Sequence, residues 1–139
     1  MAILVPIKDA EIKAEDFGKP VADWINANTL GAWTPVSYAS GWSTFPNYQA
    51  WTMRKQSTTV QVRGVAMCPA LSAGTTYAMG SIPVGFRPPI GQLMIGLCGL
   101  YTPGAIRIDL QADGTINVNP TIAVPAGGFV SLSAVYWLD

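Results

Sequence analysis

The strongest constraint on the fold is an alternation of apolar and polar residues with a period of two, which recurs in separate runs after Trp33. In the run 57–67, Val60, Val62 and Ala66 fall on one side and Gln61 and Arg63 on the other. Successive side chains of a β-strand point to opposite faces, so such a run predicts a half-buried strand. The runs 105–120 and 127–139 repeat the pattern.

A hairpin is expected inside the second of these runs. Asp113 and Gly114 stand between two alternating stretches, and an Asp-Gly pair in that position is a strong signal for a tight turn. Seven or eight short strands with turns between them and almost no helix predict an all-β fold. We expect an antiparallel β-sandwich of jelly-roll type.

The first thirty residues differ in kind from the rest. Pro6 and the charged run 8–16 predict an extended arm, and the stretch 17–28 predicts a short helix with Pro20 in its first turn. The helix either caps the domain's own core or, with the arm, anchors the protein on a larger particle. We therefore divide the chain into an arm and helix, 1–30, and a β-sandwich domain, 31–139. The candidate attachment residues of the arm and helix are Ile3, Leu4, Val5, Ile7 and Trp24.

Charge argues against nucleic acid as a partner. The chain carries eight basic and eight acidic residues, with a slight acidic excess in residues 1–23 and a slight basic excess in the remainder. Binding to phosphate backbones needs a dense basic patch, and neither part has one. The opening stretch MAILVPI is too short for a membrane span and lacks a preceding basic region, so neither secretion nor membrane insertion is expected.

The stretch 92–101 is apolar on both faces, whereas an antiparallel strand normally has one polar face that is exposed to solvent. Only 12% of the residues are charged, about half the ~25% usual for soluble domains, which favours a surface partly covered by partners. We expect a homo-oligomer, most simply a closed ring of three. The candidate interface residues are Arg87, Leu93, Met94, Ile95, Leu97 and Leu100.

The stretch SIPVGFRPPIGQ, 81–92, is either a ligand clamp or a rigid corner. Its prolines donate no backbone hydrogen bond and favour extended geometry in the preceding residue, so a corner is the better interpretation. In that case Gly85 supplies the bend and Phe86 packs beneath it. Arg87 is then expected to donate to loop carbonyls or to a carboxylate of a neighbouring subunit.

Aromatic side chains are concentrated between residues 33 and 51. They either fill the core or form a contact surface for a carbohydrate or a protein, because Trp and Tyr combine a large apolar ring with a polar group. The candidate ligand-binding residues are Trp33, Trp42 and Tyr48. Trp42, which lies between Gly41 and Ser43, is expected to be the most exposed.

The amino-acid composition gives little support for a catalytic function. The chain has no histidine, which removes the commonest general base and metal ligand. Cys68 and Cys98 lie in apolar runs and are expected to be buried free thiols, and no paired carboxylates suit glycoside hydrolysis. We expect no enzymatic activity, no cofactor and no metal.

The ordered set of motifs resembles the small virion proteins of tailed bacteriophages, especially minor tail proteins and receptor-binding head domains of phages of Gram-positive hosts. The set comprises FGKPVADWINAN, VQVRGVAM, SIPVGFRPP, IRIDLQADGTINV and GGFVSLSAVYWL. The family often shows a Leu-Pro-x-Gly-aromatic-Arg-Pro corner, and here Ile82 replaces the leucine.

The resemblance implies a trimeric β-sandwich mounted on the virion, made in the host cytoplasm and attached to tail proteins or to the major capsid protein. Its function would be structural, most simply as a minor tail protein that contacts the host, with a host surface saccharide as a further partner. The chain carries a peptide arm in place of a long shaft, which also fits a capsid decoration protein. A carbohydrate-binding module is a second alternative.

Overall fold

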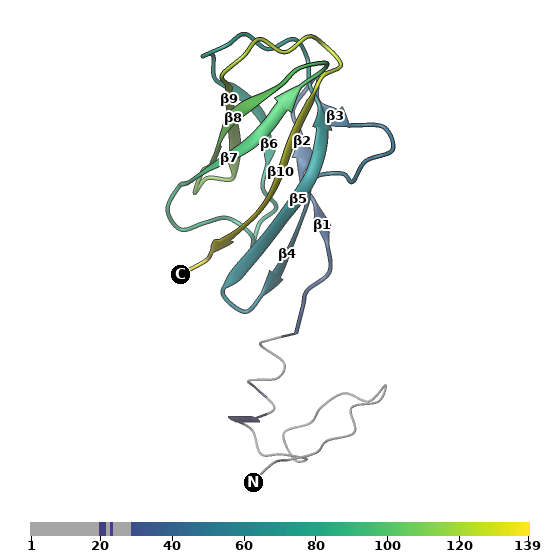
Figure 1. Ribbon diagram of the computed structural model, residues 1–139. Coiled ribbons are helices and arrows are strands. Elements are labelled where there is room, and N and C mark those ends of the chain that lie inside the picture. Colours follow the sequence, from purple (N-terminus) through teal and green to yellow (C-terminus); the bar gives the residue numbers. More distant parts are fainter. Residues whose placement is uncertain (1–19, 22, 24–28) are drawn as a thin grey trace.

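The computed structural model describes residues 20, 21, 23 and 29–139 (Figure 1). The arm and helix expected over 1–30 fall almost entirely outside these residues, as do the candidate attachment residues from Ile3 to Trp24. No helix within the described part of the chain is long and apolar enough to span a membrane.

The domain is all-β, as expected. The seven longer strands are β4 (Thr52–Gln56), β5 (Thr59–Met67), β6 (Tyr77–Ser81), β7 (Gln92–Gly99), β8 (Pro103–Leu110), β9 (Thr115–Pro120) and β10 (Phe129–Trp137). Three two-residue strands precede them: β1 (Thr34–Pro35), β2 (Ser37–Tyr38) and β3 (Ser43–Thr44). The runs 57–67 and 127–139 form β5 and β10, the run 105–120 forms most of the β8–β9 hairpin, and the apolar set of each alternation points toward the core.

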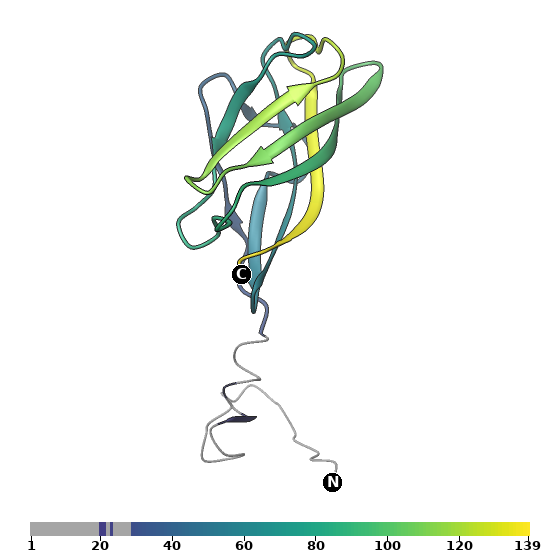
Figure 2. The ribbon, with the colours of Figure 1, turned by 90° about the vertical axis from the view of Figure 1, so that its left-hand side faces the viewer.

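All ten strands join one antiparallel sheet in the order β1-β4-β5-β10-β7-β8-β9-β6-β2, with β3 paired to β5. The first and last strands of this order are consecutive in the chain, separated only by Val36. The segment 34–38 thus pairs with β4 at one end of the sheet and with β6 at the other, which nearly closes the sheet into a barrel (Figures 1 and 2). The jelly-roll arrangement stays a prediction.

The core lies inside this curved sheet. Its largest fully buried side chains are Trp51, Tyr136, Met53, Met79 and Ile82. The indole nitrogen of Trp51 donates to the carbonyl oxygen of Val130 at 3.2 Å, so the polar group of this ring is satisfied within the core. Burying such large apolar surfaces is the main source of stability for a domain of this size.

The predicted hairpin is confirmed between β8 and β9. Gly114 adopts a positive φ of 97°, which glycine tolerates without steric cost. The carboxylate of Asp113 accepts the backbone N–H of Thr115 at 2.9 Å, and this hydrogen bond lowers the pKa of Asp113. This hydrogen bond stabilises the turn, and the turn fixes the register in which β8 and β9 pair.

The corner interpretation of 81–92 is also confirmed. Gly85 has a φ of 93° and Phe86 packs against the core. Arg87 Nε donates to the carbonyl oxygen of Ile82 at 3.1 Å, as expected for a donor to a loop carbonyl. The backbone N–H of Ile82 in turn donates to the carbonyl oxygen of Gly114 at 2.7 Å, so the corner is held against the β8–β9 turn.

Cys68 and Cys98 are both buried and free, as the sequence predicts. Burial raises the pKa of the Cys68 thiol to about 11 and also raises the pKa of the Cys98 thiol, because a thiolate is poorly solvated in the core. Both side chains remain neutral apolar groups at neutral pH.

Candidate functional site

A hollow lies on the outer face of β10, between β5 and β7. We call it the β10 groove. Its volume is about 490 Å³, and its lining includes two glycines and two serines, Gly64, Gly96, Ser131 and Ser133. Tyr48, Arg63 and Val65 line the β5 side, and Ile95 and Leu97 line the β7 side.

Small residues line the groove, and the two strands beside it diverge. Gly96 lies so close to the backbone of Ser131 that no side chain would fit at this position. Pairing of β10 with β7 ends at Ser131 and Leu97, whereas pairing with β5 continues to Trp137. The half of β10 beyond Ser131 is therefore open on the side that faces β7.

Two further hollows extend the groove along β10. One, of about 310 Å³, shares Tyr48, Val65 and Ser131 with the groove and continues to Phe129. The other, of about 410 Å³, shares Arg63 and Ser133 with it and continues to Val135. The three hollows share lining residues and follow one another along the outer face of β10.

Tyr48 is the most accessible of the three predicted ligand-binding residues. Its side chain is 63% exposed and lines both the β10 groove and the hollow next to it. Its ring packs edge-on against Phe45 with the centroids 5.5 Å apart, and Phe45 packs in the same way against Phe129 at 6.4 Å. These contacts hold Tyr48 at the rim, where a flat apolar ligand can stack on it.

The prediction that Trp42 is exposed was wrong. Its side chain is only 8% exposed and belongs to the core. The chain turns at Gly41, which has a φ of 89°, and the N–H of Trp42 donates to the carbonyl oxygen of Ala39 at 3.1 Å. This turn allows the indole ring to be buried, and burial of so large a ring is strongly favourable. Trp42 is thus not accessible as a ligand platform.

Trp33 lies in the hollow that continues toward Val135 and contacts two arginines. The guanidinium carbon of Arg63 lies 3.8 Å from the centroid of the Trp33 ring, and that of Arg54 lies 4.5 Å from it. The Arg54 Nε also donates to the Gln61 side-chain oxygen at 2.7 Å. The ring therefore serves to position two cations. The sequence interpretation missed both arginines, because only the pairing of β4 with β5 brings them together.

Of the predicted interface residues, Arg87 is exposed in the corner before β7, and the others come from β7 and the residue that follows it. Leu93, Ile95 and Leu97 point outward and are 62%, 65% and 56% exposed. Met94 points the other way and packs against the core, and Leu100 is partly buried beyond the end of the strand. The exposed row is apolar and continuous, as the doubly apolar sequence of this strand predicts for a covered surface.

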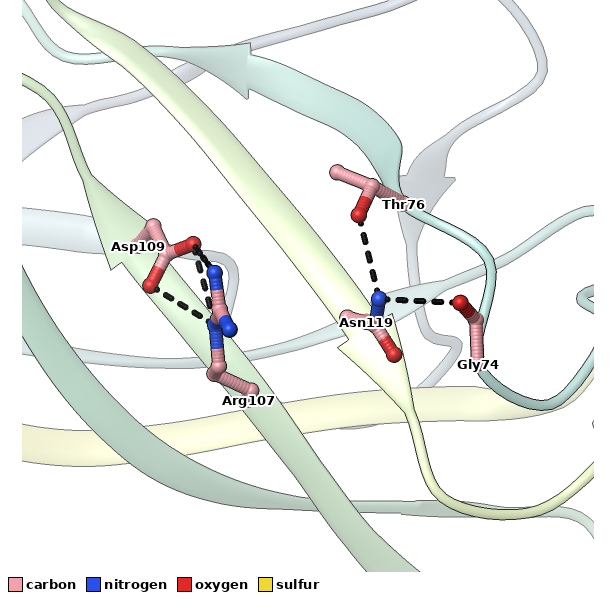
Figure 3. A network of polar contacts seen from close by, with 5 residues as sticks. All are labelled: Gly74, Thr76, Arg107, Asp109 and Asn119. Atoms are coloured by element: carbon pink, nitrogen blue, oxygen red, sulfur yellow. Dashed lines mark hydrogen bonds and ion pairs between the residues drawn. The ribbon is translucent and has the colours of Figure 1, made fainter.

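The neighbouring outer face of β8 and β9 is polar (Figure 3). Arg107 and Asp109 form a bidentate ion pair, with Nη2 to Oδ2 at 2.7 Å. Asn119 donates to the carbonyl oxygen of Gly74 and to the hydroxyl of Thr76. These side chains satisfy one another, so this face offers fewer groups to a ligand than the groove does.

The described part of the chain has no group of three or more His, Cys, Asp or Glu side chains that could hold a metal ion. The groove presents hydroxyl groups, an exposed phenol and a guanidinium beside aliphatic walls. Such a surface can bind a molecule that has both apolar faces and hydrogen-bonding edges.

Comparison with known proteins supports the fold. No protein-family model matches the chain, and no curated protein matches it. Among solved structures, the chain is similar to the head domain of phage bIL170, described in connection with a common fold for the receptor-binding domains of lactococcal phages. The match has a TM-score of 0.65 at 18% sequence identity and covers 78% of this chain and 99% of that domain. The chain therefore shares the fold of a phage receptor-binding head domain.

Proposed function

We propose that this protein is a non-enzymatic, host-contacting component of a phage virion, whose β-domain acts as a receptor-binding head. The observation that carries the proposal is the shared fold with the bIL170 head domain over nearly its whole length. The exposed groove along β10 supports a binding role. We infer that residues 1–30 attach the domain to the particle.

We further propose that the protein is a homotrimer that covers the exposed row Leu93, Ile95 and Leu97. A row of three leucine and isoleucine side chains, each more than half exposed, is costly on an isolated domain. A closed ring would bury the same row on every copy. Because Ile95 and Leu97 also line the β10 groove, the groove would lie at the border between two copies.

The oligomer is tested by light scattering of the full chain together with Ile95→Asp. We expect a trimer for the parent chain and a folded monomer for the variant, since a buried carboxylate at the interface is strongly unfavourable. Val84→Asp is the control, because Val84 is 82% exposed in the corner and is not part of β7. A monomeric parent chain, or a trimer that tolerates Ile95→Asp, would refute the proposed interface.

The host contact is tested by binding of the full chain to host cells and to polysaccharide extracted from them. Tyr48→Ala should weaken binding by about tenfold, because one stacked ring contributes on the order of 1 kcal/mol. The fold and the oligomer should be unchanged, since Tyr48 lies outside the core. Binding that is insensitive to Tyr48→Ala would remove the groove from the proposal.

The place on the particle is tested by electron microscopy of virions that carry a tagged copy of the chain. Density at the distal tail is expected for a receptor-binding head. Density at capsomer junctions would instead identify a capsid decoration protein and would overturn the host-contact role.

A further inference from the structure

The two arginines at Trp33 are an unusual arrangement on a chain with so few charges. Both guanidinium carbons lie within 4.5 Å of the centroid of one indole ring, so two like charges gather at the same side chain. Arg54 and Arg63 come from adjacent strands, and the register pairs Thr52 with Arg63 and Arg54 with Gln61. The indole face attracts each cation, but their mutual repulsion remains.

No carboxylate neutralises this pair in the described part of the chain. The ion pair found there joins Arg107 to Asp109, and the Asp113 carboxylate lies near Arg87 at the other turn. Lys55 places its ammonium 5.1 Å from the ring of Phe86. Within the described residues, Arg54 and Arg63 therefore form a local concentration of positive charge that can bind an anion.

The pair borders a hollow of about 410 Å³, into which a ligand group can enter. Besides Trp33 and the two arginines, its lining includes Gln61, Ser133 and Val135. An amide and a hydroxyl group are therefore available beside the guanidiniums. Arg63 and Ser133 also line the β10 groove, so the cationic hollow opens directly from it.

We propose that Arg54 and Arg63, supported by Trp33, form a binding site for an oxyanion, a carboxylate or a phosphate group, carried by a saccharide that lies in the β10 groove. A planar guanidinium binds either group through paired hydrogen bonds. An anion bound by the arginines also offsets their positive charge. This assignment deepens the proposed host contact and rests on it for the source of the ligand.

The site is tested with the full chain by ligand-observed NMR, using glucuronate, glycerol phosphate and uncharged glucose as probes. Glucuronate and glycerol phosphate represent the two sources of the oxyanion. We expect at least one of them to bind at least tenfold more tightly than glucose. Arg63→Gln alone and the double variant Arg54→Gln/Arg63→Gln should lose this preference. Raising the salt concentration should weaken binding, because exposed charges are screened.

Arg107→Gln is the matched control, since it removes the same charge from an exposed arginine that already has a carboxylate partner. Its affinity for the anions should stay within about twofold of the parent chain. Equal binding of glucose and both anions, or an equal loss in Arg107→Gln, would overturn the site. Anion binding that appears only after the five acidic residues of 1–23 are neutralised would overturn the saccharide as the occupant, because the chain's own N-terminal segment would then fill the site.

Cell binding separates this inference from the proposed function. If the chain binds host cells and the double variant binds them equally well, the oxyanion site is wrong and the receptor-binding role stands. If the chain binds the anions through Arg54 and Arg63 but does not bind host cells, the site stands and the receptor-binding role is wrong.

Discussion

Tyr136, in the last strand, donates its hydroxyl hydrogen to the backbone carbonyl oxygen of Phe86 in the proline-rich corner. The two residues are fifty positions apart, and the hydroxyl group also lies 3.5 Å from the sulfur of Met53. The bond ties β10, which runs beneath the groove, to the corner that precedes β7. It therefore links the end of β10 to the corner that leads into β7.

Removing this link should destabilise the domain. Tyr136→Phe leaves the Phe86 carbonyl without its partner at little change in volume, and we expect a loss of about 1–2 kcal/mol in the free energy of unfolding. Urea denaturation measures it. Tyr101→Phe is the control, because Tyr101 is 91% exposed and should change stability by less than about 0.5 kcal/mol. Equal stability of the two variants would contradict the structural role of the bond.

The close approach of β7 and β10 predicts that Gly96 cannot be replaced. A Cβ atom there would lie 2.3 Å from the carbonyl oxygen of Ser131 and 2.7 Å from Cδ1 of Ile108. We expect Gly96→Ala to lower the free energy of unfolding by about 1–3 kcal/mol or more, because the backbone must shift. In Gly91→Ala the new methyl group has its nearest neighbour at 3.6 Å, so this control should remain near parent stability in thermal denaturation. A fully stable Gly96→Ala would disprove the close contact.

Thr52 carries a buried hydroxyl group without a hydrogen-bond partner in the described part of the chain. Thr52→Val removes this polar group while preserving the shape of the side chain, so we expect a gain of about 1 kcal/mol in the free energy of unfolding. Thr59→Val should have the opposite effect, because the Thr59 hydroxyl donates to the carbonyl oxygen of Gln56 at 2.9 Å. Denaturant titration of the two variants side by side checks both signs, and a loss of stability in Thr52→Val would show that its hydroxyl is satisfied.

Stability should fall at alkaline pH because of the buried thiols. Burial raises the pKa of Cys68 to about 11, whereas an unfolded chain releases the thiol proton near pH 8.5. As pH rises, the unfolded state therefore loses this proton first. The contribution of the neutral Cys68 thiol to the free energy of unfolding declines between about pH 8.5 and pH 11. The pKa of Cys98 is raised as well and adds to this decline.

The measurement is the slope of the free energy of unfolding against pH, compared between the parent chain and Cys68→Ala. The variant should show a shallower decline over this range, whatever its absolute stability. Tyr136 also has a pKa raised by burial, so a residual decline above about pH 10 should persist in the variant. Identical slopes would contradict the assignment to Cys68.

Much of the fold follows from local patterns in the sequence. The alternation at Val60, Val62 and Ala66 predicts which side chains enter the core, and all three are buried. The Asp113-Gly114 pair predicts the hairpin, and the prolines around Gly85 predict the corner, because these residues restrict the backbone within a few positions. The apolar outer face of β7 could be expected for the same reason, since the period of a strand assigns each residue to a face.

Only the tertiary structure decided which aromatic rings reach the surface. Trp42 and Tyr48 lie in one polar-aromatic stretch with no periodicity to separate them, yet one is buried and the other forms the rim of the groove. Closure of the sheet through 34–38, and the meeting of Trp33 with Arg54 and Arg63, depend on pairings between strands. A strand's own sequence determines the face on which a side chain lies, but its neighbours across the sheet are determined by register and closure, which are properties of the whole chain.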